Sequence, residues 1–114
     1  LNKHPLVDKV YHPAIETSEN HDIWKRDFTG STGLFSFSLK KFYPQSKIKK
    51  MFSKISIFKL GYSWGGYDSL ITFPPLSKRQ FKTLLKGNLI RVYCGLEDSS
   101  DQINDIINSL KTLK

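Results

Sequence analysis

The sequence has little of what several classes of protein require. It contains one cysteine, Cys94, so no disulfide can form within the chain. Its apolar runs are only a few residues long, too short to span a bilayer. No phosphate-binding glycine motif and no nucleophile-elbow motif occurs, and the three histidines lack the neighbours of a metal site. The amino-terminal segment is also unlike a signal peptide. We therefore expect a cytoplasmic protein without metal or membrane contacts.

Arginine is also scarce, although the chain is basic. The formal net charge is +8, and 15 of the 18 basic residues are lysines. Phosphate and base recognition favour the arginine fork, and the lysines are spread along the chain. The chain contains one alanine but ten isoleucines and fifteen lysines. We interpret this bias as codon-composition drift, which would have placed the lysines on a solvated surface. We expect no nucleic-acid binding, and a basic, non-enzymatic binding module is kept as an alternative.

What is present favours a single folded domain. The 114 residues fit one domain, and a hydrophobic content of 39% with 13% aromatics is typical of a globular chain. Cys94 lies in an apolar run and is interpreted as a small buried residue rather than a catalytic thiol. Because the chain does not begin with methionine, we expect it to be a piece of a longer protein.

Hydrophobic periodicity predicts the main elements of secondary structure. Runs that alternate or are short and apolar predict strands at 6–11, 34–39, 56–60 and 89–94. Helical spacing of apolar residues predicts helices at 21–28, from Pro44 through Ile55, and from about 100 to 113. The segment 72–87 is unclear, although 77–87 could form a short helix that ends at Gly87. We expect an α+β fold, an α/β sandwich with a small, mainly antiparallel sheet of about four strands and helices packed on one face.

The last predicted helix carries two further expectations. Ser99 and Gln102 are spaced as a capping box at its start. Acidic residues beside them suit the positive end of the helix dipole. Its buried stripe is expected to consist of Ile103, Ile106, Ile107, Leu110 and Leu113.

Arg91 is unusual because apolar residues flank it on both sides in the strand at 89–94. Alternation places Leu89, Arg91 and Tyr93 on one face and Ile90, Val92 and Cys94 on the other. An arginine that faces a core is costly unless an anion meets it. Two interpretations remain open: a side chain on the wet face or edge of the sheet, or a guanidinium fork that binds a carboxylate.

The stretch GYSWGGYDS, residues 61–69, is the second unusual feature. Gly65 and Gly66 permit positive φ angles and a close approach of the backbone. Exposed backbone N–H groups in such a turn can bind an anion. The alternative is an ordinary loop at the exit of a strand, covered by aromatic side chains.

Four blocks of the sequence resemble a known family in order and spacing. HPAI, HDIWKRDFTGSTGLFSFSLK, GYSWGGYDSLI and LIRVYCGLEDSSDQINDI resemble the C-terminal domain of the bacterial cystathionine β-lyases, pyridoxal-phosphate enzymes of the cysteine and methionine metabolism family. By this resemblance Arg91 and the backbone N–H of Trp64 bind the substrate α-carboxylate. Ser63 lies beside the catalytic lysine and the cofactor, and Tyr62 lines the substrate pocket.

The resemblance also implies what these 114 residues do not contain. The Schiff-base lysine, the phosphate loop and the pyridine-facing aspartate would belong to a preceding large domain. Intact members of the family cleave the C–S bond of L-cystathionine and resemble homotetramers. We expect the chain alone to be inactive, to bind no pyridoxal phosphate, and to be a monomer or to associate weakly. Alternatives are a related γ-synthase, γ-lyase or methionine γ-lyase, or a separately expressed remnant of a broken gene.

Overall fold

The computed structural model describes residues 1–62, 65–76 and 84–114 of the chain. Within these ranges the helices are α1 (His21–Asp27), α2 (Gln45–Phe52) and α3 (Ser99–Leu110), the last continued by a 3-10 turn at Lys111–Leu113. The strands are β1 (Val7–Tyr11), β2 (Leu34–Leu39), β3 (Lys59–Leu60), β4 (Leu70–Thr72) and β5 (Leu89–Tyr93). Strands and helices share one chain without regular alternation, so the predicted α+β class is confirmed.

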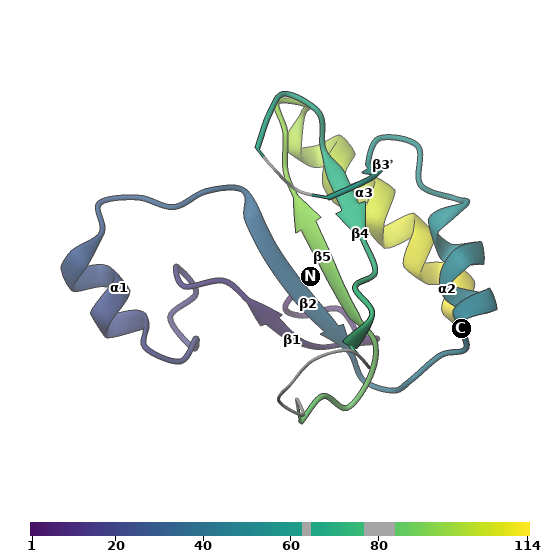
Figure 1. Ribbon diagram of the computed structural model, residues 1–114, viewed down its shortest axis with the longest axis horizontal. Helices are drawn as coiled ribbons and strands as arrows, with labels where there is room; N and C mark the ends of the chain where they lie inside the picture. Colours follow the sequence, from purple (N-terminus) through teal and green to yellow (C-terminus); the bar gives the residue numbers. More distant parts are fainter. Residues whose placement is uncertain (63–64, 77–83) are drawn as a thin grey trace.

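The strands form one sheet in the order β1-β2-β5-β4-β3 (Figure 1). β1 with β2, β2 with β5 and β5 with β4 pair antiparallel, whereas β3 pairs parallel to β4. The sheet is therefore mainly antiparallel, as predicted, but has five strands where about four were expected. β5, late in the sequence, lies at the centre of the sheet between two strands that precede it.

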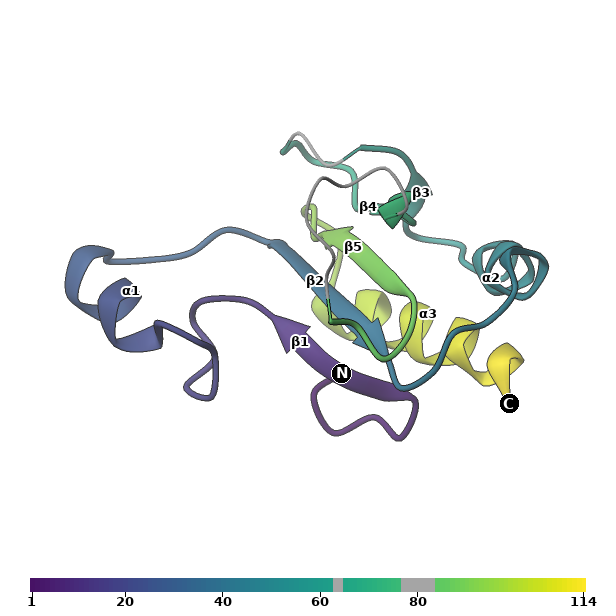
Figure 2. The same ribbon diagram turned by 60° about the horizontal axis from the view of Figure 1, so that its bottom comes forward.

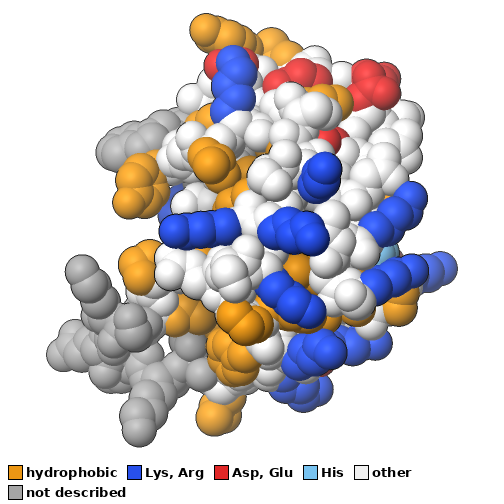
Figure 3. All heavy atoms as spheres, turned by 90° about the vertical axis from the view of Figure 1, so that its right-hand side faces the viewer, with side chains coloured by type: hydrophobic (Ala, Val, Ile, Leu, Met, Phe, Trp, Pro, Cys, Tyr) orange, Lys and Arg blue, Asp and Glu red, His pale blue; other side chains and the backbone are white. Residues whose placement is uncertain are grey.

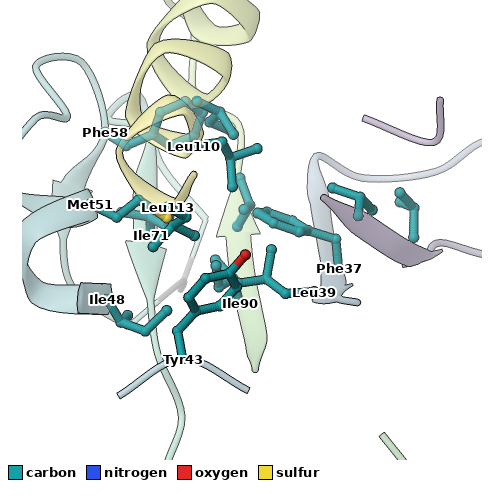
Figure 4. Packing of buried hydrophobic residues seen from close by; sticks show 14 residues of the cluster. Phe37, Leu39, Tyr43, Ile48, Met51, Phe58, Ile71, Ile90, Leu110 and Leu113 are labelled. Atoms are coloured by element: carbon teal, nitrogen blue, oxygen red, sulfur yellow. The ribbon is translucent and has the colours of Figure 1, made fainter. Parts of the chain in front are cut away.

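One face of the sheet is covered by α2 and α3, and the core lies between these layers (Figure 4). Ile90 and Val92 of β5 are fully buried there, next to Phe37 of β2. The helices contribute Ile48, Met51, Ile106 and Leu110. The alternation predicted for β2 and β5 and the apolar stripe of α2 are thus confirmed, because these residues all meet in one cluster.

The helix α1 does not pack on the sheet but lies at the end of an outlying arm, residues 12–33 (Figures 1 and 2). None of its residues is buried, and Phe28, just beyond it, is 63% exposed. Helical spacing predicted this helix correctly. Periodicity alone could not reveal that none of its residues would be buried.

The strand predicted at 56–60 is wrong for its first three residues. The backbone N–H groups of Ser56, Ile57 and Phe58 donate to the Asp105 carboxylate of α3 at 2.9, 2.8 and 3.2 Å, and the Ser56 hydroxyl donates to it at 3.0 Å. These donors are therefore not available to a strand ladder. Only Lys59–Leu60 pairs with β4.

Two expectations for the last helix are also wrong. Its N-cap is Asp98, whose side chain accepts from the N–H groups of Ser100 and Asp101, so Ser99 and Gln102 form no capping box. Gln102 instead turns its amide into the body of the molecule. Ile103, expected in the buried stripe, is 56% exposed, because it faces a groove at the end of α3 rather than the core.

β4 was not predicted, because its three residues follow directly on the glycine-rich stretch. The helix considered at 77–87 lies largely outside the described residues, and Leu84–Gly87, which are described, are not helical. No helix within the described ranges is long and apolar enough to cross a membrane.

Candidate carboxylate-binding site

Arg91 lies in the middle of the central strand, on the face of the sheet opposite α2 and α3. Its neighbours Ile90 and Val92 are buried in the core, so the pleat directs Arg91 the other way. Its register partners are Ser36 on β2 and Thr72 on β4. The side chain is half-buried and lies neither in the core nor at an edge of the sheet.

The guanidinium of Arg91 has no anionic partner among the residues that the structure describes. All ten carboxylate side chains belong to described residues. The ion pairs that these residues form are Arg26–Asp27, Lys59–Asp68 and Lys86–Asp8. The short polar side chains of Ser36 and Thr72 flank Arg91 on the neighbouring strands. A half-buried cation without a counter-ion is a ready site for an anion from outside the chain.

The glycine turn is held beside this face by Tyr93, two residues after Arg91 on the same strand. The Tyr93 hydroxyl accepts from the N–H of Gly66 at 3.0 Å and donates to the Gly66 carbonyl at 3.2 Å. Gly65 has a φ of 80°, in the left-handed region that favours glycine. Tyr93 and Arg91 are two residues apart on β5, so their side chains lie on the same face of the sheet. The turn and the guanidinium are therefore connected through this one strand.

The residues after the turn are bound to the connection between β5 and α3. The Glu97 carboxylate accepts from the Ser69 N–H at 3.0 Å and from the Ser69 hydroxyl at 2.6 Å. The Gly95 N–H donates to the Ser69 hydroxyl oxygen at 2.8 Å, and the Gln102 amide donates to the same oxygen at 3.1 Å. The bonds from Ser69 lower the pKa of Glu97 from its usual range to about 2. The carboxylate therefore stays charged at any working pH.

Gly95 permits this docking because a side chain would occupy the place of the neighbouring backbone. A Cβ at Gly95 would overlap the Tyr67 carbonyl oxygen and lie 2.7 Å from the Ser69 nitrogen. We expect Gly95→Ala to destabilise the chain by about 1–3 kcal/mol, the usual cost of overpacking. Urea denaturation followed by circular dichroism measures the change.

Gly30→Ala is the matched control, because a Cβ there meets no atom within 4 Å. We expect its free energy of unfolding to stay within about 0.5 kcal/mol of the original value. Equal stabilities for the two variants would contradict the close packing of residues 67–69 on Gly95.

The structure describes only two of the four predicted site residues, Arg91 and Tyr62. Arg91 lies on the face that alternation predicted, and Tyr62 is 76% exposed. Ser63 and Trp64 lie outside the described residues, so their roles stay predictions. Sequence reasoning missed Tyr93 and Glu97. The signal for Tyr93 was its place two residues after Arg91, which puts both on one face.

Cys94 and the histidines add no further chemistry. Burial, and then the nearby Glu97 carboxylate, raise the pKa of the Cys94 thiol, which disfavours the reactive thiolate. Cys94 packs against the core but is only half-buried, where its apolar context predicted a buried residue. Among the described residues no cluster of three His, Cys, Asp or Glu side chains could hold a metal ion.

Comparison with known proteins places the chain in a family. A sequence model of the Cys/Met metabolism PLP-dependent enzymes matches residues 1–111. The cystathionine beta-lyase of Escherichia coli is 44% identical over 111 residues, covering 93% of this chain and 28% of that protein. The L-alanine/L-glutamate racemase of Wolbachia pipientis is 37% identical over 118 residues, covering 99% of this chain and 29% of that protein.

A solved structure agrees with these matches. The crystal structure of cystathionine gamma synthase from Xanthomonas oryzae in complex with cystathionine superposes with a TM-score of 0.80 and 25% identity, covering 98% of this chain and 30% of that one. The chain belongs to the Cys/Met metabolism PLP-dependent enzyme family. It spans less than a third of the length of these relatives.

The described residues do not by themselves fit pyridoxal phosphate. Every lysine in the described ranges is exposed at the surface, whereas a lysine that forms a Schiff base works best where it is desolvated or beside another cation. What the described residues do present is the half-buried guanidinium of Arg91, without an anionic partner among them. No chemical step through the cofactor follows from these residues.

Proposed function

We propose that this chain is the C-terminal, substrate-binding domain of a carbon–sulfur lyase that acts on L-cystathionine. The observation that carries the proposal is Arg91, half-buried at the centre of the sheet and without an anionic partner in the chain. Membership of the family and the β-lyase relatives support the reaction class. The large domain, with the cofactor and its lysine, would be supplied by the rest of the polypeptide.

In this proposal the work of the chain is to bind and orient the substrate. Arg91 receives the α-carboxylate through two parallel N–H···O bonds, which fix its orientation as well as its position. The Trp64 N–H is predicted to donate to the same carboxylate from the turn that Tyr93 holds. A substrate held at a second point cannot rotate about the arginine, and this lowers the entropic part of the barrier. Tyr62, exposed next to the turn, is proposed to line the pocket.

A second candidate function is amino-acid racemisation. The racemase relative aligns over 99% of this chain, slightly more than the 93% of the β-lyase of Escherichia coli. An amino-acid racemase must also hold an α-carboxylate, so Arg91 would serve that reaction equally. Residues 1–114 alone do not distinguish the two reactions, because the groups that contact the reacting bond are proposed to lie elsewhere.

Assay of the full-length polypeptide that carries these 114 residues tests the proposal. With L-cystathionine and pyridoxal phosphate we expect pyruvate and a free thiol in equal amounts. Racemisation of L-alanine without pyruvate release would replace the lyase by the second candidate. The isolated 114-residue chain is the control: we expect no turnover, and no change in visible absorbance on mixing with pyridoxal phosphate.

A basic, non-enzymatic binding module for nucleic acid or an acidic partner remains the other alternative. Figure 3 shows Lys and Arg side chains dispersed among polar and apolar ones over the side that presents α2. The exposed lysines of and near α2 include Lys47, Lys49, Lys50 and Lys54. Since α2 packs on the opposite face of the sheet from Arg91, these charges would not contribute to the Arg91 site. A steep salt dependence of DNA binding would support that alternative.

A further inference from the structure

Tyr93 makes a contact outside the hydrophobic core. It lies on the face of β5 away from the core, so its hydroxyl contributes nothing to the cluster around Ile90 and Val92. Yet this hydroxyl acts both as acceptor and as donor toward a single residue: it accepts from the Gly66 N–H and donates to the Gly66 carbonyl. A side chain that satisfies both polar groups of one residue restricts the position and the tilt of the adjoining peptides.

The restricted residue directly adjoins the predicted substrate contacts. Gly66 is followed by residues 67–69, which are bound to Gly95, Leu96 and Glu97. On its other side comes Gly65, with its φ of 80°, and then the predicted donor Trp64. Tyr93 is therefore the last described anchor of the turn before the residues expected to bind the carboxylate.

The same tyrosine is coupled to the guanidinium through the strand. Arg91 and Tyr93 are alternate residues of β5, pairing with Ser36 and Leu34 on one side and with Thr72 and Leu70 on the other. The pairing on both sides holds this strand in the interior of the sheet. The Tyr93 hydroxyl thus connects the turn to the strand that carries the guanidinium.

We propose that Tyr93 is a positioning residue for substrate binding: its hydroxyl holds the glycine turn at the distance from Arg91 at which both can bind one carboxylate. The proposal rests on the function proposed above for Arg91. Tyr93 itself touches the turn and not the substrate, so its effect is on substrate affinity more than on the reaction step.

Tyr93→Phe in the full-length protein tests this, because the change removes the oxygen and keeps the ring. We expect KM for the amino-acid substrate to rise about fivefold to tenfold, with kcat within about twofold, since one positioning interaction is weakened. Tyr11→Phe is the matched control. The Tyr11 hydroxyl lies 3.3 Å from the Ser38 side chain and forms no hydrogen bond with residues 65–69, the described part of the turn, so KM should not change.

A double-mutant cycle separates positioning from a general loss of structure. With Arg91 replaced by alanine, the additional change Tyr93→Phe should leave KM unaltered, because the two residues act on one bound group. Additive effects would overturn the proposal, and so would an unchanged KM in the single Tyr93→Phe variant. If Arg91→Ala alone leaves KM unchanged, the function proposed for Arg91 fails instead.

Hydrogen exchange of the full-length protein gives a readout that needs no turnover. Mass spectrometry of peptides that contain residues 65–69 should show exchange at Gly66 about fivefold faster in Tyr93→Phe than in the original protein, since one hydrogen bond to that N–H is lost. The Tyr11→Phe control should exchange at the original rate. Equal exchange in all three proteins would show that Tyr93 does not hold the turn, and would overturn the proposal irrespective of the substrate.

Discussion

Replacing Arg91 with alanine in the full-length enzyme is expected to raise KM for the amino-acid substrate about 30-fold to 900-fold, with a smaller effect on kcat. The change corresponds to about 2–4 kcal/mol, the cost of losing a bidentate pair between a guanidinium and a carboxylate where water is partly excluded. Arg91 meets this condition, because it is half-buried in the central strand and forms no ion pair with the described part of the chain. Steady-state kinetics measures the effect.

Two variants control for loss of charge and for loss of structure. Arg91→Lys keeps the charge but not the planar fork, so its KM should lie between those of the original enzyme and of Arg91→Ala. Arg26→Ala removes an arginine of the outlying arm, whose side chain is 73% exposed and paired only with Asp27, and should leave KM unchanged. If all three variants bind substrate equally well, Arg91 is not in the site.

The largest effect on stability is expected from Asp105→Ala, which should lower the free energy of unfolding of the chain by about 2–4 kcal/mol. Asp105 is only 7% exposed, and its two oxygens accept four hydrogen bonds from Ser56, Ile57 and Phe58. Without the carboxylate the three backbone N–H groups lose their acceptor, and each unsatisfied group adds to the cost. Urea denaturation of the two proteins measures the difference.

The pH dependence of this difference identifies the carboxylate as its cause. Burial raises the pKa of Asp105, but the hydrogen bonds from Ser56, Ile57 and Phe58 outweigh it and hold the pKa below its usual value. The stabilisation is then fully present above about pH 4, the range in which an unfolded aspartate is ionised, and is lost as the pH falls through the lower pKa of the folded state. The gap between the two proteins should therefore narrow in acid.

Asp101→Ala is the matched control for this experiment. Asp101 lies in the first turn of the same helix but is exposed, so its loss should cost only about 0.5 kcal/mol through the helix dipole. A loss of stability as large as that of Asp105→Ala would mean that negative charge on α3, rather than the contact with residues 56–58, is responsible.

The local hydrophobic pattern was sufficient to predict those helices and strands whose structure depends on their own residues. β2 alternates Phe35, Phe37 and Leu39 with serines, and α2 carries its apolar residues on one side, so periodicity predicted both. Residues 56–58 look like a strand by the same criterion. They are not, because a carboxylate 47 to 49 residues away takes their N–H groups. Such a contact leaves no trace in a local window.

The candidate site, too, could be predicted from the sequence only where local pattern determines it. Alternation placed Arg91 and Tyr93 on one face, and the glycines marked a turn. The order of the sheet, with β5 between β2 and β4, was not predictable, and only this order brings the turn next to β5. Gln102 shows the opposite error: its spacing from Ser99 suited a cap, but Ser69 offered the amide a buried partner.

The central place of β5 governs the order in which the protein can assemble. Leu89–Tyr93 must enter between β2, more than fifty residues earlier, and β4, about twenty residues earlier. Until that happens, β2 and β4 expose unpaired edges to other chains, and such distant pairings form slowly. The strand that fills the gap between β2 and β4 is also the one that carries Arg91 and Tyr93. During synthesis Arg91 and Tyr93 are therefore placed in the same event that covers the inner edges of β2 and β4.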